Sequence, residues 1–262
     1  MRGRPNLYID YQKESSIFSN NTQKSWFGLL VILSVAFCFL ASDYWILLLT
    51  TSFLIAIAGW GLNIVSGLAG QINLAHGVFI GVGTYASAVI GGISTSSVVG
   101  FDLDMIFWLP LAGVAAALVG LLIAPITVKL KGLNLALVTL ALVFIGSHLF
   151  SNFKSVTGGA GLGRKVATLK LFGVNLEKGI EVGTFYFQKN QILYLFCLLT
   201  CVLAGLGFKN LVRSRAGRAY SAIRDGDIAA EALGINLFRY KASAFALSSF
   251  YGGISGALFF TV

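Results

Sequence analysis

Long apolar segments alternate with short polar ones along almost the whole chain. An α-helix needs about 20 predominantly apolar residues to cross the hydrocarbon core of a bilayer. Most of these segments reach that length when polar residues at their ends extend to the interface. We therefore predict an all-α protein, a polytopic membrane helical bundle. Its expected spans lie at about residues 26–41, 44–65, 72–93, 105–128, 133–150, 191–208 and 242–262.

The third of these spans, residues 72–93, is predicted to be interrupted. It follows the Gly-rich and partly polar passage GLNIVSGLAGQINLAHG. Backbone groups that leave a helix at membrane depth must be satisfied inside the protein or in a cavity. The polar side chains available in this passage are Asn63, Gln71, Asn73 and His76.

Two interpretations of these four residues stay open. They line or gate a solute pathway, or they only bridge backbone groups that the glycines expose. His76 fits the role of a hydrogen-bonded structural histidine, because no acidic residue lies in the same span to complete a proton relay.

Composition supports a membrane protein. Hydrophobic residues make up 56% of the chain and charged residues only 11%. Soluble domains, in contrast, average about a quarter charged residues. The 31 glycines and 3 prolines suit closely packed membrane helices. The three cysteines, Cys38, Cys197 and Cys201, lie inside apolar runs without neighbouring ligands, which favours packing over a metal site.

The positive charges predict an orientation. A net charge of +9 would suggest nucleic acid in a soluble protein, but basic residues also mark the cytoplasmic loops of membrane proteins. The polar leader 1–25 contains four of them, the turn 129–132 two and the segment 209–241 seven, which is 13 of the 19. The other six lie in the long loop 151–190, where the rule is least strict. We predict a multi-pass membrane protein, surrounded by lipid, with its N-terminus in the cytoplasm, loop 151–190 outside and no nucleic-acid partner.

The most informative polar segment runs from Ser214 to Lys241. Apolar and small residues recur in it at helical spacing, and charged residues occupy the other faces. The pattern predicts two short amphipathic helices that are broken near Gly226. One interpretation is a basic cytoplasmic loop that only follows the charge rule. However, a loop with this much pattern usually contacts a partner.

The residues GRAYSAIRDGDIAAEALGIN, followed by RYKASAFALSSFYGGISGAL, resemble the cytoplasmic coupling segment and next helix of the LIV-type branched-chain amino acid permeases of ABC importers. The elements GLN, GQ, NLAHG and GVGTY resemble the early broken helix of the same family. Relative to that family the sequence looks C-terminally incomplete. The resemblance implies partners: two cytoplasmic ABC ATPase subunits, a second homologous permease subunit and a periplasmic substrate-binding protein. It also implies that the membrane is the bacterial inner membrane.

The resemblance also implies which residues contact the ATPase. The family's EAA-x3-G pattern is matched only loosely, because the glycine that follows Glu231 comes early. The matching positions are Gly217, Arg218, Ala222, Ile223, Asp225, Ala229, Ala230 and Gly234.

The implied function is import of branched-chain or related apolar amino acids. Permeases for urea or short amides belong to the same family and are the first alternative. A secondary transporter or channel without an ATPase is a second one, although such carriers commonly have intramembrane acids or internal repeats that this sequence lacks.

Catalysis is not expected of this chain. The sequence has no Ser/His/Asp set, no paired carboxylates in an apolar run and no cluster of metal ligands. Residues 158–165, GGAGLGRK, offer Arg-Lys where a phosphate-binding loop needs Lys followed by Ser or Thr. We therefore expect no catalytic residues, no metal and no cofactor bound by this chain, and any ATP must be used by partner subunits.

Overall fold

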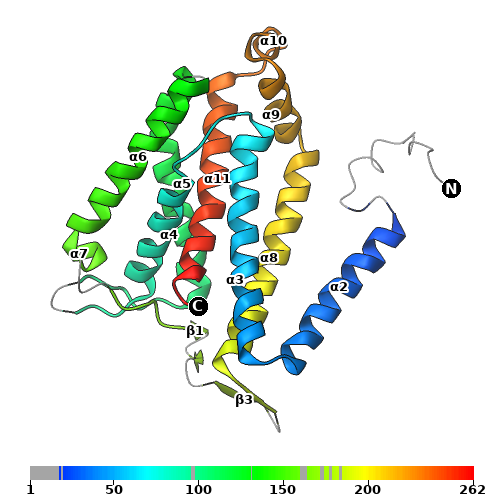
Figure 1. The fold of residues 1–262 in the computed structure, drawn as a ribbon, viewed down its shortest axis with the longest axis vertical. Coiled ribbons are helices and arrows are strands. Elements are labelled where there is room, and N and C mark those ends of the chain that lie inside the picture. The colour runs from blue at the N-terminus through cyan, green and yellow to red at the C-terminus, as the bar shows by residue number, and fades with distance from the viewer. Residues whose placement is uncertain are drawn as a thin grey trace.

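Long helices dominate the computed structural model and run side by side between two ends of a bundle (Figure 1). The prediction of an all-α membrane bundle is confirmed. Most of the predicted leader, Lys131 and part of the long loop lie outside the described residues. The structure describes residue 18 and residues 20–95, 98–130, 132–159, 164–171, 174–176, 179–182 and 185–262.

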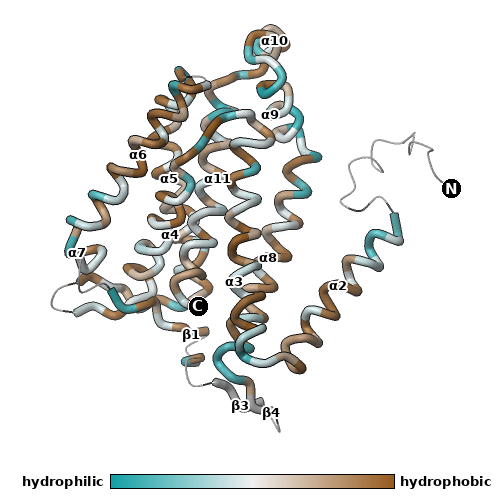
Figure 2. The backbone as a smooth tube through the Cα atoms, viewed as in Figure 1, coloured by the Kyte–Doolittle hydropathy of each residue, from teal (hydrophilic) through white to brown (hydrophobic). Residues whose placement is uncertain are grey.

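Six of the described helices are long and apolar enough to cross a membrane, and their ends lie within about five residues of the predicted spans. In Figure 2 they carry long hydrophobic stretches, whereas hydrophilic residues gather near the ends of the bundle. The helices are α2 (Asn21–Leu40), α3 (Asp43–Leu62), α5 (Met105–Lys129), α6 (Gly132–Asn152), α8 (Lys189–Arg213) and α11 (Leu237–Phe259).

The remaining elements lie at the ends of the bundle or interrupt it. Helix α3 continues as the π-helix η1 (Asn63–Leu68), and α4 (His76–Gly91) is shorter than a full span. Two short helices, α9 (Arg215–Asp225) and α10 (Asp227–Ala232), lie at one end, as Figure 1 shows. We call them the coupling pair.

The opposite end contains α7 (Lys154–Thr157) and two antiparallel strand pairs. In the first, Lys170 pairs with Asn175 and Leu171 with Val174. In the second, residues 180–182 pair with residues 185–187. The strands are β1 (Lys170–Leu171), β2 (Val174–Asn175), β3 (Ile180–Val182) and β4 (Phe185–Phe187).

Helix α11 forms the centre of the bundle. In its apolar stretch 61% of the residues are buried, against 6% in α2, which packs mainly on α8. Helices α3, α4 and α5 pack directly around α11 (Figure 1). The sequence of α11 explains this position, since serines, alanines and glycines follow one another along it and let neighbouring backbones approach.

Two glycines bring α4 and α11 together. A Cβ atom at Gly83 of α4 would lie 2.2 Å from the carbonyl oxygen of Gly253 and 2.3 Å from its Cα atom. A Cβ atom at Gly256 of α11 would lie 2.0 Å from the carbonyl oxygen of Ile80. No side chain fits at either position without moving a backbone, so this contact requires glycine on both helices.

Hydrogen bonds from side chains to backbone carbonyls add to this packing. The Ser255 hydroxyl of α11 donates to the carbonyl of Leu54 in α3 at 2.8 Å. The Tyr251 hydroxyl donates to the carbonyl of Ala204 in α8 at 2.9 Å. The Thr84 hydroxyl of α4 lies 2.9 Å from the carbonyl of Gly256. Each such bond contributes about 0.6 kcal/mol in a membrane, and together they fix α11 against three neighbours.

We predict that Gly83→Ala destabilises the bundle, because the new methyl group must push α4 away from α11. Overpacking of this kind costs about 1–3 kcal/mol. The matched control is Gly77→Ala on the same helix, where nothing lies within 4 Å of the added atom. Thermal unfolding of the purified variants in detergent measures both. Equal midpoints for the two variants would contradict the close α4–α11 contact.

Candidate functional site

The interruption predicted in the third span lies between η1 and α4. Residues 69–75 are not helical, so α4 starts at His76. The His76 ring lies beside Ala58, which is ten residues before the end of η1 at Leu68. At about 1.5 Å of rise per residue, the first residue of α4 is therefore well below that end of the bundle. The chain returns into the bundle as irregular backbone before it becomes helical.

Polar side chains satisfy part of this irregular backbone. The N–H of Ala75 donates to the Asn73 side-chain oxygen at 3.0 Å, and the N–H of Leu74 donates to the Thr139 hydroxyl of α6 at 3.2 Å. The N–H of Gln71 donates to the carbonyl of Val65 at 3.0 Å. The Asn73 side-chain oxygen thus satisfies a backbone group. This agrees with the interpretation in which the four polar residues only bridge backbone that the glycines expose.

His76 joins three helices. Its Nε2 lies 2.9 Å from the carbonyl oxygen of Ala58 in α3, and because a carbonyl only accepts, Nε2 carries the proton. In the neutral ring Nδ1 is then an acceptor, and it lies 3.5 Å from the Ser248 hydroxyl of α11. Gly61 and Gly252 leave room for the ring. These contacts match a hydrogen-bonded structural histidine.

Gln71 and Asn73 also carry polar atoms that lack a partner. Both residues are 5% exposed. Among the described residues, no group hydrogen-bonds to either polar atom of the Gln71 amide or to Nδ2 of Asn73. A buried polar group without a partner costs about 1–3 kcal/mol, so these amides favour a polar partner from outside the described residues. Asn63 differs from both, because it is exposed and its side chain folds over Gly67.

The coupling pair has the two-helix form that the sequence predicts, with the break at Gly226. Ser214 caps α9, since its hydroxyl oxygen accepts the N–H of Gly217 at 3.2 Å. The loop that follows α10 turns at Gly234, whose φ of +81° favours glycine. Asn236 then caps α11 by accepting the N–H of Arg239 at 3.0 Å.

The eight predicted ATPase-contact residues differ in their exposure and form three groups. Gly217, Ile223 and Ala230 are buried, and a Cβ atom at Gly217 would lie 2.3 Å from the carbonyl oxygen of Leu211 in α8. These three residues pack the coupling pair onto the rest of the chain. Ala222 is half-buried. The exposed members are Arg218, Asp225, Ala229 and Gly234.

Two large apolar residues of α10 and the turn after it face outward. Ile228 is 83% exposed and Leu233 is 79% exposed, although both lie in a polar segment at the end of the bundle. Ala219 and Ile223 of α9, in contrast, are buried. The break at Gly226 changes the direction of the chain, so a single periodicity cannot assign both faces.

The coupling pair also contacts the interrupted segment directly. Arg224 of α9 donates from Nη1 to the carbonyl oxygen of Gly67 in η1 at 3.1 Å. A Cβ atom at Gly70 would lie 3.2 Å from the Cα atom of Arg224, and Gly70 has a φ of +65°. Only glycine combines this conformation with this close approach. Helix α9 thus lies directly against the end of η1 and the first residues of the interruption.

A cavity of about 500 Å³ lies between these elements. The interrupted segment, the turn between α5 and α6, the coupling pair and the start of α11 form its walls. Its lining includes Gln71, Ile223, Asp227 and Lys241. The interrupted segment and the coupling pair thus share the walls of one cavity.

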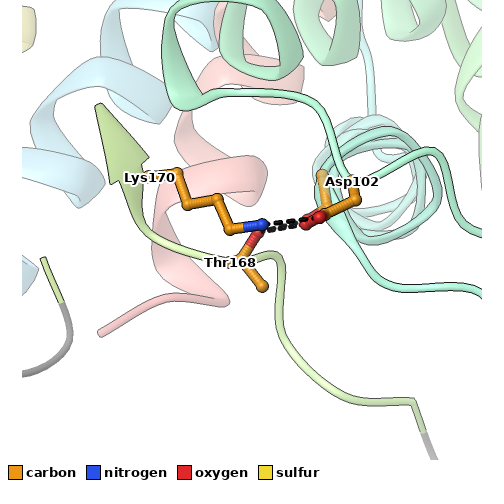
Figure 3. Close-up of polar contacts among 4 residues, drawn as sticks. Asp102, Thr168 and Lys170 are labelled. Carbon is orange, nitrogen blue, oxygen red and sulfur yellow. Dashed lines mark hydrogen bonds and ion pairs between the residues drawn. The ribbon is translucent and has the colours of Figure 1, made fainter. Parts of the chain in front are cut away.

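A polar cluster holds the opposite end of the bundle together (Figure 3). The Lys170 ammonium lies 2.5 Å from Oδ2 of Asp102, and the Thr168 hydroxyl lies 3.0 Å from Oδ1. The N–H of Thr168 donates to the carbonyl of Gly91 at 2.9 Å. Asp102 has a φ of +49°, which is uncommon for a residue other than glycine. These bonds attach residues 164–171 to the loop between α4 and α5.

The fold and this geometry define a class: a multi-pass membrane protein with an interrupted helix and a pair of short surface helices at one end. A sequence model of the family described as "Branched-chain amino acid transport system / permease component" matches residues 44–262, and the chain belongs to this family. The predicted family resemblance is confirmed.

Two curated relatives are the "High-affinity branched-chain amino acid transport system permease protein LivM" of Escherichia coli (strain K12) and the protein of the same name from Salmonella typhimurium (strain LT2). Each is 32% identical over 249 residues, which cover 90% of this chain and 57% of the relative. The chain therefore spans little more than half the length of these relatives. No solved structure matches the chain.

We predict that the Asp102 cluster weakens in acid. The hydrogen bonds from Lys170 and Thr168 lower the pKa of the Asp102 carboxyl below its ordinary value. A carboxylate whose pKa is lower in the folded state than in the unfolded state stabilises the fold. This contribution is fully present above the unfolded-state pKa of about 4 and is lost as the pH falls through the folded-state pKa. The midpoint of thermal unfolding should therefore be higher for the native protein than for Asp102→Asn at pH 7. The difference should shrink below about pH 4 and disappear below the folded-state pKa of Asp102. A difference that does not change with pH would contradict the role of the carboxylate.

Proposed function

We propose that this chain is a membrane-spanning permease subunit of an ABC importer that moves branched-chain or related apolar amino acids into the cytoplasm. Membership in the branched-chain amino acid permease family carries the proposal, and the similarity to two LivM proteins supports it. In this proposal separate subunits hydrolyse ATP, and this chain has no ATP-hydrolysing site of its own. Its role is to provide the path and to change shape when the ATPase does.

The coupling pair is the proposed docking surface for the ATPase. Large apolar side chains at the end of a membrane bundle are expected to be covered by a partner, and Ile228 and Leu233 are such residues. The exposed Arg218 and Asp225 lie in the same segment and can fix the register by charge pairing. A short helix pair that enters a groove of the partner is a common recognition mode. In this arrangement the buried residues of the pair support the surface from below.

The interrupted segment is the proposed wall of the solute path. The unpartnered amide atoms of Gln71 and Asn73 can hydrogen-bond a polar solute, and His76 fixes the start of α4 beside them. An N-terminal helix end at this depth favours a carboxylate group. Asn63 is exposed on η1 and is the least suited of the four predicted residues.

The other partners follow from the same proposal. A second homologous permease subunit completes the path across the inner membrane. A periplasmic binding protein delivers the substrate to the end formed by loop 151–190, and the coupling pair and the N-terminus are cytoplasmic. The charge distribution of the sequence supports this orientation.

Uptake of radiolabelled leucine, with urea for comparison, tests the proposal in cells that express the complete importer. We expect leucine uptake that depends on the ATPase and urea uptake at the background level. Ile228→Glu should lower both leucine uptake and co-purification of the ATPase by about tenfold, since a charge replaces an apolar anchor. The matched control Ile228→Val keeps the apolar surface and should behave as the native protein. ATPase-independent uptake, or urea uptake in place of leucine uptake, would refute the assignment.

A further inference from the structure

A buried ion pair joins the coupling pair to the central helix. Nζ of Lys241, on the second turn of α11, lies 2.9 Å from Oδ2 of Asp227, the first residue of α10. The two side chains are 5% and 14% exposed. The other described ion pairs are far more accessible: the side chains of Arg224 and Asp225, for example, are 48% and 71% exposed. Lysine is almost never this buried unless it is paired.

The ion pair is one of several contacts that hold α10 against the rest of the chain. A helix of six residues is not stable alone, so contacts with the rest of the chain hold it in place. Gly226 and Gly234 flank it and provide little stiffness. The contacts that hold α10 from inside include the burial of Ala230 and the bond between Asp227 and Lys241. Removing one partner of a buried pair leaves an uncompensated charge, so the bond resists separation of α10 from α11.

Helix α9 is attached to α11 only two residues further along. The hydroxyls of Tyr220 and Ser243 lie 2.9 Å apart, and Tyr220 is 1% exposed. Both helices of the coupling pair are thus bonded to the same two turns of α11. On its other side, α9 bonds to η1 through Arg224 and Gly67. Of these attachments, only the Asp227–Lys241 bond joins two opposite charges.

We propose that Asp227 and Lys241 are positioning residues that make α11 follow α10 when the ATPase moves the coupling pair. This inference rests on the proposed ATPase docking and adds the point at which that movement enters the bundle. Since α11 packs against α3, α4 and α5, a displacement of its first turns changes the walls of the path. Loss of the ion pair therefore separates ATP hydrolysis from transport without removing the docking surface.

Proteoliposomes with the complete importer test this proposal. The measurement is the ratio of leucine taken up to ATP hydrolysed, together with co-purification of the ATPase. The variant Asp227→Asn/Lys241→Met removes both charges and leaves no charge buried alone, so it should fold. We expect it to retain the ATPase and to lower the ratio about tenfold. The charge swap Asp227→Lys/Lys241→Asp should bring the ratio back toward the native value.

Two further results make the test specific. Lys24→Met removes an exposed lysine charge from α2, outside both the coupling pair and loop 151–190, and should leave the ratio unchanged. A native ratio in the doubly neutral variant, or a charge swap that stays as uncoupled as the neutral variant, would overturn the proposal. If the ATPase fails to co-purify with the native chain, the proposed docking is wrong, and that outcome is distinct from a native ratio in a complex that still assembles.

Discussion

The structure depends on how closely other helices can approach α11. Lipid is as apolar as the helix surfaces, so burial alone does not bring membrane helices together, and close packing with a few hydrogen bonds must do so. Gly83 and Gly256 allow the backbones of α4 and α11 to touch, and the hydroxyls of Ser255 and Tyr251 attach α11 to α3 and α8. Helix α2 shows the other extreme, because only 6% of its apolar stretch is buried. A rigid centre of this kind can carry a displacement from one end of the bundle to the other.

Because α11 is rigid, the contacts that attach α9 and α10 to it can pass a movement on to the rest of the bundle. The coupling pair bonds to α11 through Asp227 and Tyr220 and to η1 through Arg224. It therefore connects the central helix and the interrupted helix. In the proposed function these two elements line the solute path, and because α4 begins below this end, a small movement of residues 69–75 would change the wall of that path without breaking a continuous helix. The irregular backbone is the deformable element, and α11 is the stiff one.

Much of this arrangement could be predicted from the sequence. Apolar length indicated the helices, glycine and polar residues marked the interruption, and Gly226 marked the break in the coupling pair. Which residues of the coupling pair are buried could not be predicted. The chain changes direction at Gly226, so a helical period that fits α9 does not continue into α10. Ile223 therefore faces inward and Ile228 outward. The pairing of Asp227 with Lys241 was equally inaccessible, since 14 residues and a turn separate them and no helical spacing relates them.

The central claim is that the coupling pair lies in the cytoplasm and the loop 151–190 on the other side of the membrane. Labelling of introduced cysteines with a membrane-impermeant thiol reagent tests it most directly. The native cysteines are buried, so they should contribute little background. Cysteine at Ser155, which is exposed, should react in intact spheroplasts, and cysteine at Ala232, exposed on α10, should react only in inverted vesicles. The reverse pattern, or reaction of both from one side, would contradict the account.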